Sequence, residues 1–300
     1  IEGAFRMVRG GSQIARELSK VIHTNGGRIV KHAEVVSIDT VDKLVTSVQL
    51  HNGSEIKALR FVSNLHPSVT MDLLRPNILR SSYLKRIKEL DNGSSFVSVQ
   101  FSLKASNIPY FNHNIYYLLT GAEPGDIVHK INADWPQHFL VCTGRDAFQQ
   151  SYANTLTVLA HAEYVDFVEW EISHNTILSP GERGENYYRM KEGLIEKIIS
   201  RLEKVIPQIR TAITAAYCST PLTIRDFLNS PEGTAYGIEK NAPEIIKCLI
   251  PPYTKIPNLF LTGQNTDIHG IYGTSISALL TLSHLPEGKN IWEEIALQQK

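Results

Sequence analysis

The segment NLFLTGQNTDIHGIYGTSISALL, residues 258–280, decides the fold class that we expect for this chain. Its apolar first half predicts a short buried strand that ends at Thr262, and its last residues predict a helix that begins near Thr274 or Ser275. A buried strand that leads directly into a helix is typical of α/β proteins. The segment therefore predicts an α/β unit.

Three glycines lie in or beside the loop between this strand and this helix. Gly263 permits a sharp turn after the strand, and Gly270 and Gly273 let the backbone approach a ligand closely. The free N–H groups at a helix start, with the positive end of the helix dipole, suit a phosphate or the partly anionic ring edge of a flavin. A tight α/β turn without a ligand is the alternative that this pattern leaves open.

The first part of the chain also has an α/β pattern. Segment 10–27 places apolar residues on one helical stripe, with Ser12 as the expected N-cap, and it predicts a helix that two glycines stop. Segment 28–38, RIVKHAEVVSI, predicts a strand. The apolar segments that follow predict a hairpin that turns at Asn52-Gly53.

The pattern changes from residue 66 onward. Three segments have the alternating or continuous apolar positions of antiparallel strands, namely 94–103, 138–144 and 154–164. Segment 187–207 predicts an amphipathic helix that ends at Pro207. Packing against a core explains the apolar face of that helix better than docking on a membrane does.

Composition argues against several classes of protein. The 300 residues include 30 Lys and Arg and 30 Asp and Glu, so no net charge recruits nucleic acid. The three cysteines are far apart and form no C-x-x-C pair, which argues against a metal site and fits reduced thiols in a cytoplasmic protein. No apolar run approaches the roughly 20 residues of a membrane span. The motifs of hydrolases, zinc proteases and P-loop kinases do not occur.

Four blocks of the sequence resemble the flavoproteins of the phytoene desaturase, carotenoid isomerase and retinol saturase group. Segment 258–280 is similar to the C-terminal motif of that group, and its GQN…HG…G string is typical of the retinol saturase branch. Three further blocks agree in the same order along the chain, namely the helix and strand at 10–38, FVSNLHPSVTMDLL at 61–74 and STPLTIRDFLNSPEGTAYG at 219–237. The resemblance thus covers nearly the whole chain.

The resemblance implies a FAD cofactor and the residues that contact it. The backbone of Val35 would contact the adenine, and the loop of segment 258–280 would close over the flavin. Gln264 and Asn265 would bond the ribityl or phosphate groups. The implied cofactor-binding residues are Val35, Gly263, Gln264, Asn265, Gly270, Ile271, Tyr272 and Gly273.

His269 lies in the same loop, and two roles are open for it. It is either a structural histidine that bonds the loop backbone or a general acid, because saturating a double bond needs a proton as well as a hydride. Tyr272 would act as a donor or as a ring that shapes the site.

The implied activity is that of an oxidoreductase. The group transfers a hydride between flavin N5 and a carbon of an apolar polyene, so we expect action on carbon–carbon double bonds of a retinoid or carotenoid, with saturation preferred over desaturation or isomerisation. NAD(P)H is the candidate electron donor. We expect an apolar isoprenoid substrate and a cytoplasmic protein with peripheral membrane contact. An amine-oxidase-like flavoenzyme and a non-catalytic isoprenoid-binding module are the alternatives.

The resemblance also implies the domain organisation. We expect a mixed α/β (α+β) fold in which 1–65 and 241–300 form a discontinuous FAD/NAD(P)-binding-like domain, and 66–240 an inserted substrate domain of antiparallel sheet and helix. The motif G-x-G-x-x-G, which opens the nucleotide-binding unit of the group, does not occur in the chain. We therefore expect an incomplete FAD domain, and a C-terminal fragment that is inactive and free of FAD by itself.

Overall fold

The computed structural model describes residues 6–7, 10–119, 130–145, 148, 151–288 and 290–298. The chain folds into two compact units, each built from two separate parts of the sequence. The first unit contains residues of 1–31 and 95–223, and the second unit contains residues of 32–94 and 224–300.

The chain passes between the units near residues 32, 95 and 224, whereas the predicted domain boundaries are near 66 and 240. Segment 66–94 goes with the second unit because Met71, Leu74 and Ile87 are fully buried in the core of that unit. The cofactor and substrate roles assigned to the two parts of the chain stay predictions.

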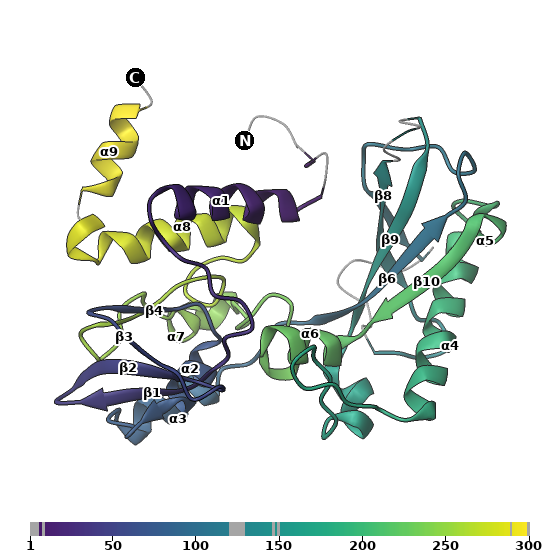
Figure 1. Cartoon of the computed structure of the whole chain (residues 1–300). Coiled ribbons are helices and arrows are strands. Elements are labelled where there is room, and N and C mark those ends of the chain that lie inside the picture. Colours follow the sequence, from purple (N-terminus) through teal and green to yellow (C-terminus); the bar gives the residue numbers. More distant parts are fainter. Residues whose placement is uncertain are drawn as a thin grey trace. The chain divides into compact units, whose positions relative to one another are not determined.

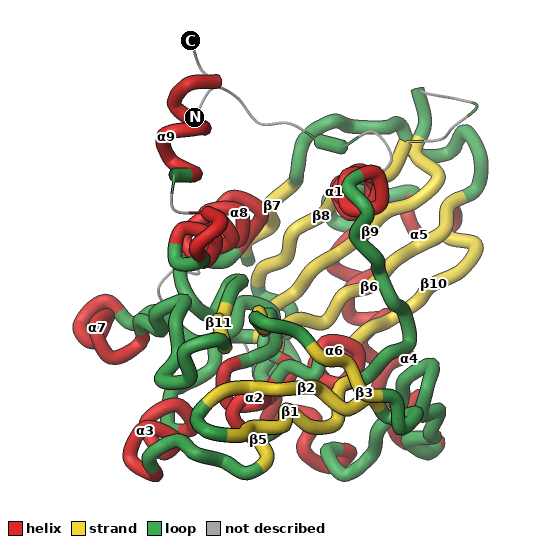
Figure 2. The backbone as a smooth tube through the Cα atoms, turned by 60° about the vertical axis from the view of Figure 1, so that its left-hand side comes forward, coloured by secondary structure: helices red, strands yellow, loops and turns green. Residues whose placement is uncertain are grey.

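An antiparallel sheet of five strands forms the centre of the first unit, with the order β10-β6-β9-β8-β7 (Figure 2). Its strands are β6 (Ser95–Leu103), β7 (Ile115–Leu118), β8 (His138–Arg145), β9 (Ala153–Ala162) and β10 (Ile213–Ser219). The helices are α1 (Ser12–Thr24), α4 (Glu185–Leu202), α5 (Ile209–Ala212) and the 3-10 helix Tyr164–Trp170, and α6 (Pro221–Leu228) leads into the second unit. The three strands predicted in this part of the chain are confirmed.

Alternation along the strands gives this sheet one buried face. Val97 and Val99 on β6 are fully buried, whereas Ser98 between them is partly exposed. Helix α4 lies along the sheet (Figure 1) and contributes Leu194 and Ile198 to the same core. Burial of the apolar face of α4 confirms that this helix packs on a core.

Helix α4 ends at Leu202, five residues before the predicted end at Pro207. The carbonyl of Leu202 accepts hydrogen bonds from the N–H groups of Val205 and Ile206, so the chain turns before it reaches the proline. The predicted end at Pro207 was wrong: the last residues before the proline form turns with i→i−3 bonds, and Ile206 is buried in the core.

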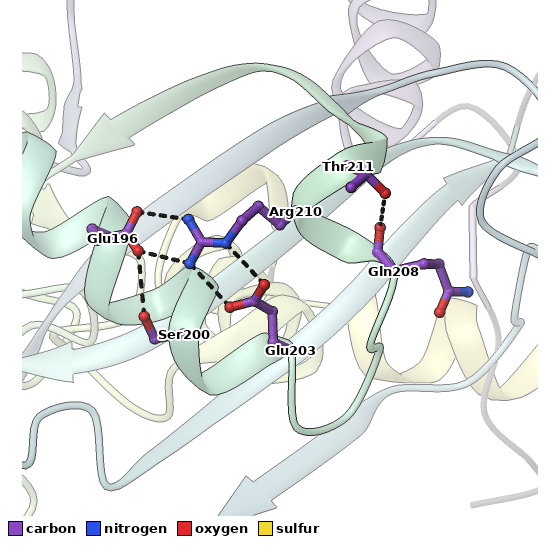
Figure 3. Close-up of polar contacts among 6 residues, drawn as sticks. All are labelled: Glu196, Ser200, Glu203, Gln208, Arg210 and Thr211. Atoms are coloured by element: carbon purple, nitrogen blue, oxygen red, sulfur yellow. Dashed lines mark hydrogen bonds and ion pairs between the residues drawn. The ribbon is translucent and has the colours of Figure 1, made fainter.

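Arg210 ties the short helix α5 back to α4 (Figure 3). Its Nη2 lies 2.7 Å from Oε1 of Glu196, and its Nε lies 2.8 Å from Oε1 of Glu203. Hydrogen bonds from Arg210 lower the pKa of both carboxyls. The bridge fixes the reversal between α4 and the strand β10.

Helix α1 forms where the sequence predicts it, but its start and its surface differ from the prediction. Gly11 occupies the N-cap instead of Ser12, and no side chain caps the helix. None of its residues is buried, and the apolar side chains of Leu18 and Val21 are 60% and 57% exposed.

Two sheets form the second unit. One has four strands in the order β3-β2-β1-β5, and the other is a parallel pair of β4 and β11. The strands are β1 (Val35–Val41), β2 (Leu44–Leu50), β3 (Glu55–Lys57), β4 (Phe61–Ser63), β5 (Leu74–Arg75) and β11 (Leu259–Leu261). The helices are α2 (Pro67–Asp72), α3 (Ser81–Lys88), α7 (Ile245–Cys248), α8 (Gly270–Ser283) and α9 (Ile291–Gln298), with 3-10 turns at Pro231–Gly233, Ala242–Glu244 and Pro286–Gly288.

The hairpin at Asn52-Gly53 is confirmed. Strands β2 and β3 pair antiparallel across it, and Gly53 has a φ of +81°. The strand predicted at 28–38 begins only at Val35; residues 28–32 are exposed, and strand pairing of this segment starts with Val35 opposite Leu50. Strand β4 leaves the hairpin sheet to pair with β11 from the other end of the sequence.

Candidate functional site

The candidate site lies at the carboxyl ends of the parallel strands β4 and β11. Leu261 pairs with Ser63 at the last position of both strands, and the N–H of Thr262 donates to the carbonyl of Ser63 at 3.0 Å. Loops that leave the carboxyl ends of neighbouring parallel strands form the usual ligand site of α/β sheets. The predicted glycine loop starts at this edge.

Gly263 makes the turn that the sequence predicts. Its φ is +95°, and a Cβ at this position would overlap Oδ1 of Asn64, which follows β4. A glycine is therefore required both by the backbone conformation and by the close approach of the two strand ends.

Helix α8 is anchored to this strand end by small polar side chains. The N–H of Gly263 donates to Oγ of Ser277 at 2.8 Å, and the hydroxyl of Thr281 donates to the carbonyl of Leu261 at 2.9 Å. The hydroxyl of Thr266 donates to the carbonyl of Gly263 at 2.9 Å. These bonds fix the loop against the helix that follows it.

Helix α8 begins at Gly270, four or five residues before the predicted start at Thr274 or Ser275. The hydroxyls of Thr274 and Ser275 donate to the carbonyls of Gly270 and Ile271 inside the helix, at 2.8 Å each, so neither residue is a cap. The prediction was wrong because serine and threonine can bond back into a helix as well as cap it.

The start of α8 is open to solvent. No side chain caps it, and nothing lies within 4 Å of the position of a Cβ at Gly270. Ile271 and Tyr272 are 68% and 77% exposed. The first N–H groups of the helix are thus available to an anionic group.

Gly273 contacts the chain's own loop. A Cβ at this position would overlap the carbonyl oxygen of Ile268, so Gly273 lets the loop fold tightly onto the first turn of the helix. This internal contact explains the glycine whether or not a ligand is bound.

Gln264 and Asn265 face the segment around Gly237. Oδ1 of the buried Asn265 accepts from the N–H of Ile238 at 3.0 Å. In the amide orientation that satisfies both atoms, Gln264 donates to the carbonyl of Ala235 and accepts from the N–H of Gly237, at 3.3 Å each. These contacts give both amides a structural role, and their predicted bonds to the cofactor stay a prediction.

His269 occupies the N-cap position of α8 and is exposed. Its side chain makes no hydrogen bond within the described part of the chain, and its ring packs against that of Tyr236 with a centroid distance of 4.5 Å. Of the two roles left open by the sequence, the structural bond to the loop backbone is thus not formed.

Val35 lies in a different sheet from the strands that lead into the Gly263–Gly273 loop. It begins β1 in the four-stranded sheet, opposite Leu50, and it packs on the core of the second unit. The structure therefore brings together the predicted residues between Gly263 and Gly273 on one loop and helix start. The predicted contact of Val35 with adenine stays a prediction.

Two buried or partly buried ionisable residues of the second unit, Lys240 and His66, were missed from the sequence. Nζ of Lys240 donates to the carbonyl of Asn265 at 2.8 Å and to that of Cys248 at 3.3 Å, and burial lowers the pKa of this lysine. His66 is buried at the start of α2, and desolvation lowers its pKa to about 4. Neither residue has a spacing signal, because Lys240 bonds Asn265 from a distant part of the sequence and His66 interacts electrostatically with Lys240.

The resemblance in sequence implies a flavin, and the residues at the start of α8 fit the edge of its ring. The uncapped helix start, the open space in front of Gly270 and the strand ends suit a partly anionic group. Gly270, Ile271 and Tyr272 would hold such an edge through their backbone N–H groups. Within the described residues, no three His, Cys, Asp or Glu side chains lie together in a way that could hold a metal ion.

The fold of the chain is similar to that of solved oxidoreductases. An oxidoreductase from Methanosarcina mazei is similar with a TM-score of 0.56 and 15% identity, covering 90% of this chain and 53% of that protein. Cyclohexylamine oxidase from Brevibacterium oxydans is similar with a TM-score of 0.51 and 10% identity, covering 96% of this chain and 53% of the oxidase. Identities this low show the fold alone.

Sequence relatives give a narrower class. The chain is 26% identical to all-trans-retinol 13,14-reductase of Danio rerio, over 93% of this chain and 49% of that protein, and 24% identical to the human enzyme of that name, over 98% and 51%. Prolycopene isomerase of Daucus carota is 24% identical over 86% of this chain and 40% of that protein. No family model matches the chain.

The chain is thus related to retinol-reducing and carotenoid-modifying oxidoreductases, which confirms the resemblance predicted from the sequence. It spans about half the length of the retinol reductases that it matches. Among the helices described, none combines the length and the apolar character that a bilayer-spanning helix needs.

Proposed function

We propose that this chain forms part of a FAD-dependent oxidoreductase that saturates a carbon–carbon double bond of an apolar isoprenoid. The observation that carries the proposal is the uncapped start of α8 at the carboxyl ends of β4 and β11, beside His269. The relatives named for retinol reduction and for carotenoid isomerisation support a polyene as the substrate.

In this proposal the second unit belongs to the discontinuous FAD domain. Its loop from Gly263 to Gly273 would contact the flavin, and the N–H groups at the start of α8 would stabilise negative charge on the ring edge. FAD supplies the hydride chemistry when it is bound. His269 would supply a proton from a ring nitrogen to one carbon of the double bond, and the hydride for the neighbouring carbon would come from the bound cofactor.

The first unit would bind the substrate. On the face of its sheet opposite the core, Leu140 and Leu159 are cross-strand partners, and Phe96 packs against His161 on the same face with ring centroids 4.4 Å apart. These half-buried side chains would contact a polyene through apolar area. At about 0.8 kcal/mol for each buried CH₂, a twenty-carbon isoprenoid would need no charged clamp.

An absorbance assay on the full-length protein tests this function. Protein reconstituted with FAD is reduced by NADPH or dithionite and mixed with a retinoid or a carotenoid, and a second sample with oxidised FAD is mixed with a primary amine in air, so that dioxygen reoxidises the flavin. Saturation shortens the conjugated system, so we expect the polyene absorption to move to shorter wavelength. Oxidation of the amine without any change in the polyenes would favour the amine-oxidase-like alternative and overturn the proposal. Binding of polyene by a protein that retains no flavin would instead support the non-catalytic module.

A further inference from the structure

Tyr236, a residue outside the predicted site, packs against His269 of that site. Tyr236 belongs to the segment Thr234–Ile238, which approaches the loop of the candidate site from another part of the second unit. Its ring lies 4.5 Å from that of His269, centroid to centroid, at an interplanar angle of 48°.

The backbone on both sides of Tyr236 is firmly held. The carbonyl of Gly237 accepts from the N–H of Gly93 at 2.8 Å and from the hydroxyl of Thr234 at 3.0 Å. On the other side, the N–H of Ala235 donates to the carbonyl of Ser94 at 3.2 Å. These hydrogen bonds hold the backbone of Tyr236 in place.

The segment also meets the site loop in close contact. Gly237 has a φ of +76°, and a Cβ at this position would overlap Oδ1 of Asn265. The same Asn265 oxygen accepts from the N–H of Ile238. The turn that carries Tyr236 and the loop that carries His269 are thus locked together through Asn265.

His269 has no comparable anchor of its own. It lies at the N-cap of α8, is exposed, and makes no side-chain hydrogen bond within the described part of the chain. An exposed histidine without a partner samples several rotamers, so the ring of Tyr236 is the contact that selects one of them. A general acid needs such a fixed direction to act within hydrogen-bond reach of its substrate.

We propose that Tyr236 is a positioning residue that holds the His269 imidazole beside the start of α8. Tyr236 acts through its ring, and it leaves the proton transfer itself to His269. This inference rests on the proposed function, in which His269 protonates one carbon of the double bond. The two electrons come from the reduced flavin that the proposed function supplies, and the imidazole regains its proton from solvent.

The ring contact is tested first in the 300-residue chain, by NMR of the His269 ring signals. Tyr236→Leu should shift these signals and broaden them, whereas Tyr236→Phe should keep them within the range of the native protein. Tyr253→Leu is the matched control, because Tyr253 packs in the same unit on a different histidine, His284, at 5.1 Å. His269 signals that stay unchanged in folded Tyr236→Leu protein would overturn the inference.

The catalytic consequence is tested in the full-length flavoprotein by single-turnover saturation. Tyr236→Phe should stay within about twofold of the native rate, and Tyr236→Leu should lower it by on the order of tenfold or more with unchanged flavin affinity. Adding Tyr236→Leu to His269→Ala should cause no further loss, because the tyrosine acts only through the histidine. An additive loss, or an undiminished rate in Tyr236→Leu, would overturn the inference. Failure of the native protein to bind flavin or reduce any polyene would instead overturn the proposed function, with the NMR contact unaffected.

Discussion

At the scale of single residues, the glycines of the site loop are required for two different reasons, namely close contact with another part of the chain and a positive φ. Gly263 and Gly273 are required by contacts within the chain, with Asn64 and with Ile268. Gly270 has a φ of +81° and open space around it, so only its backbone conformation demands glycine. The sequence predicts close approach to a ligand at both Gly270 and Gly273. Only Gly270, at the start of the helix, has the open space for it, and this role stays a prediction.

Replacing Gly273 by valine should disrupt the site loop. The new side chain would overlap the carbonyl of Ile268, so the loop must move away from the first turn of α8. In the full-length protein we expect loss of flavin retention, measured by flavin titration, while circular dichroism shows the antiparallel sheet intact. Gly193→Ala is the control, because Gly193 lies in α4 with nothing within 4 Å of its Cβ position. FAD affinity that stays unchanged in Gly273→Val would show that this loop does not face the flavin.

His66 should make the stability of the protein fall in mild acid. Desolvation lowers its folded-state pKa to about 4, below its ordinary value of 6.5. Above pH 6.5 both states are neutral; as the pH falls toward 4, the unfolded chain takes up a proton that the folded chain refuses, and up to about 3 kcal/mol of stability is lost. His66→Asn keeps a side chain that can cap α2, and it should flatten the dependence of unfolding free energy on pH over this interval. The exposed His51→Asn should leave it as steep as in the native protein.

At the scale of elements, two amphipathic helices with similar sequence patterns have opposite surroundings. Helix α4 buries Leu194, Ile198 and Leu202 against the five-stranded sheet, whereas α1 buries no residue. Periodicity predicted both helices because a stripe of apolar side chains favours a helix wherever it can be covered. It could not show which stripe is covered within this chain.

Substitutions on α1 and α4 should therefore differ in their effect on stability. Leu18→Ser with Val21→Ser removes apolar side chains that are largely exposed, and we expect a small change in the melting temperature of the 300-residue chain. Leu194→Ala should cost about 2–5 kcal/mol, because it leaves a cavity in the core of the first unit. Thermal unfolding of both variants measures the difference. A large loss in the α1 double variant would mean that its stripe is packed in solution.

The ion pairs of Arg210 should contribute in a way that depends on salt and pH. Arg210→Gln removes the bridge from α5 to Glu196 and Glu203 (Figure 3). Because both carboxyl pKa values are lowered in the folded protein, their contribution is present above the usual glutamate pKa and is lost as the pH falls through the folded values. We expect a modest stability difference between variant and native protein near neutral pH that shrinks in high salt. Denaturation curves at low and high salt check this, and a difference that grows with salt would contradict it.

At the scale of the whole molecule, each compact unit is built from two stretches of sequence, and the candidate site is assembled from three stretches within the second unit. Its parts are the end of β4, the segment at 234–238 and the loop that leads into α8. The relatives are about twice as long as this chain, and the G-x-G-x-x-G motif is absent from its sequence. In the proposed function, the site would therefore contact the flavin ring without the motif that usually binds the pyrophosphate.

The 300-residue chain should for this reason purify without stoichiometric flavin. The pyrophosphate is normally held at the helix that follows G-x-G-x-x-G, so the contacts at α8 lack their main anchor. The measurement is the ratio of the visible absorbance of oxidised flavin to the ultraviolet absorbance of the protein. The full-length protein, prepared in parallel, is the positive control. A yellow 300-residue chain with one flavin per protein would refute the expectation.

The sequence by itself determined the mixed α/β class, the positions of the main helices and strands and the relationship to polyene-modifying flavoproteins. These features depend on local periodicity, on turn residues such as Asn52-Gly53, and on blocks of sequence that can be compared directly. Tertiary structure alone decided that α8 begins at Gly270, that Asn265 bonds Ile238 and that Tyr236 lies on His269. Each of these depends on which distant segment is folded against the loop, and a local pattern carries no information about a partner that the rest of the fold must bring to it.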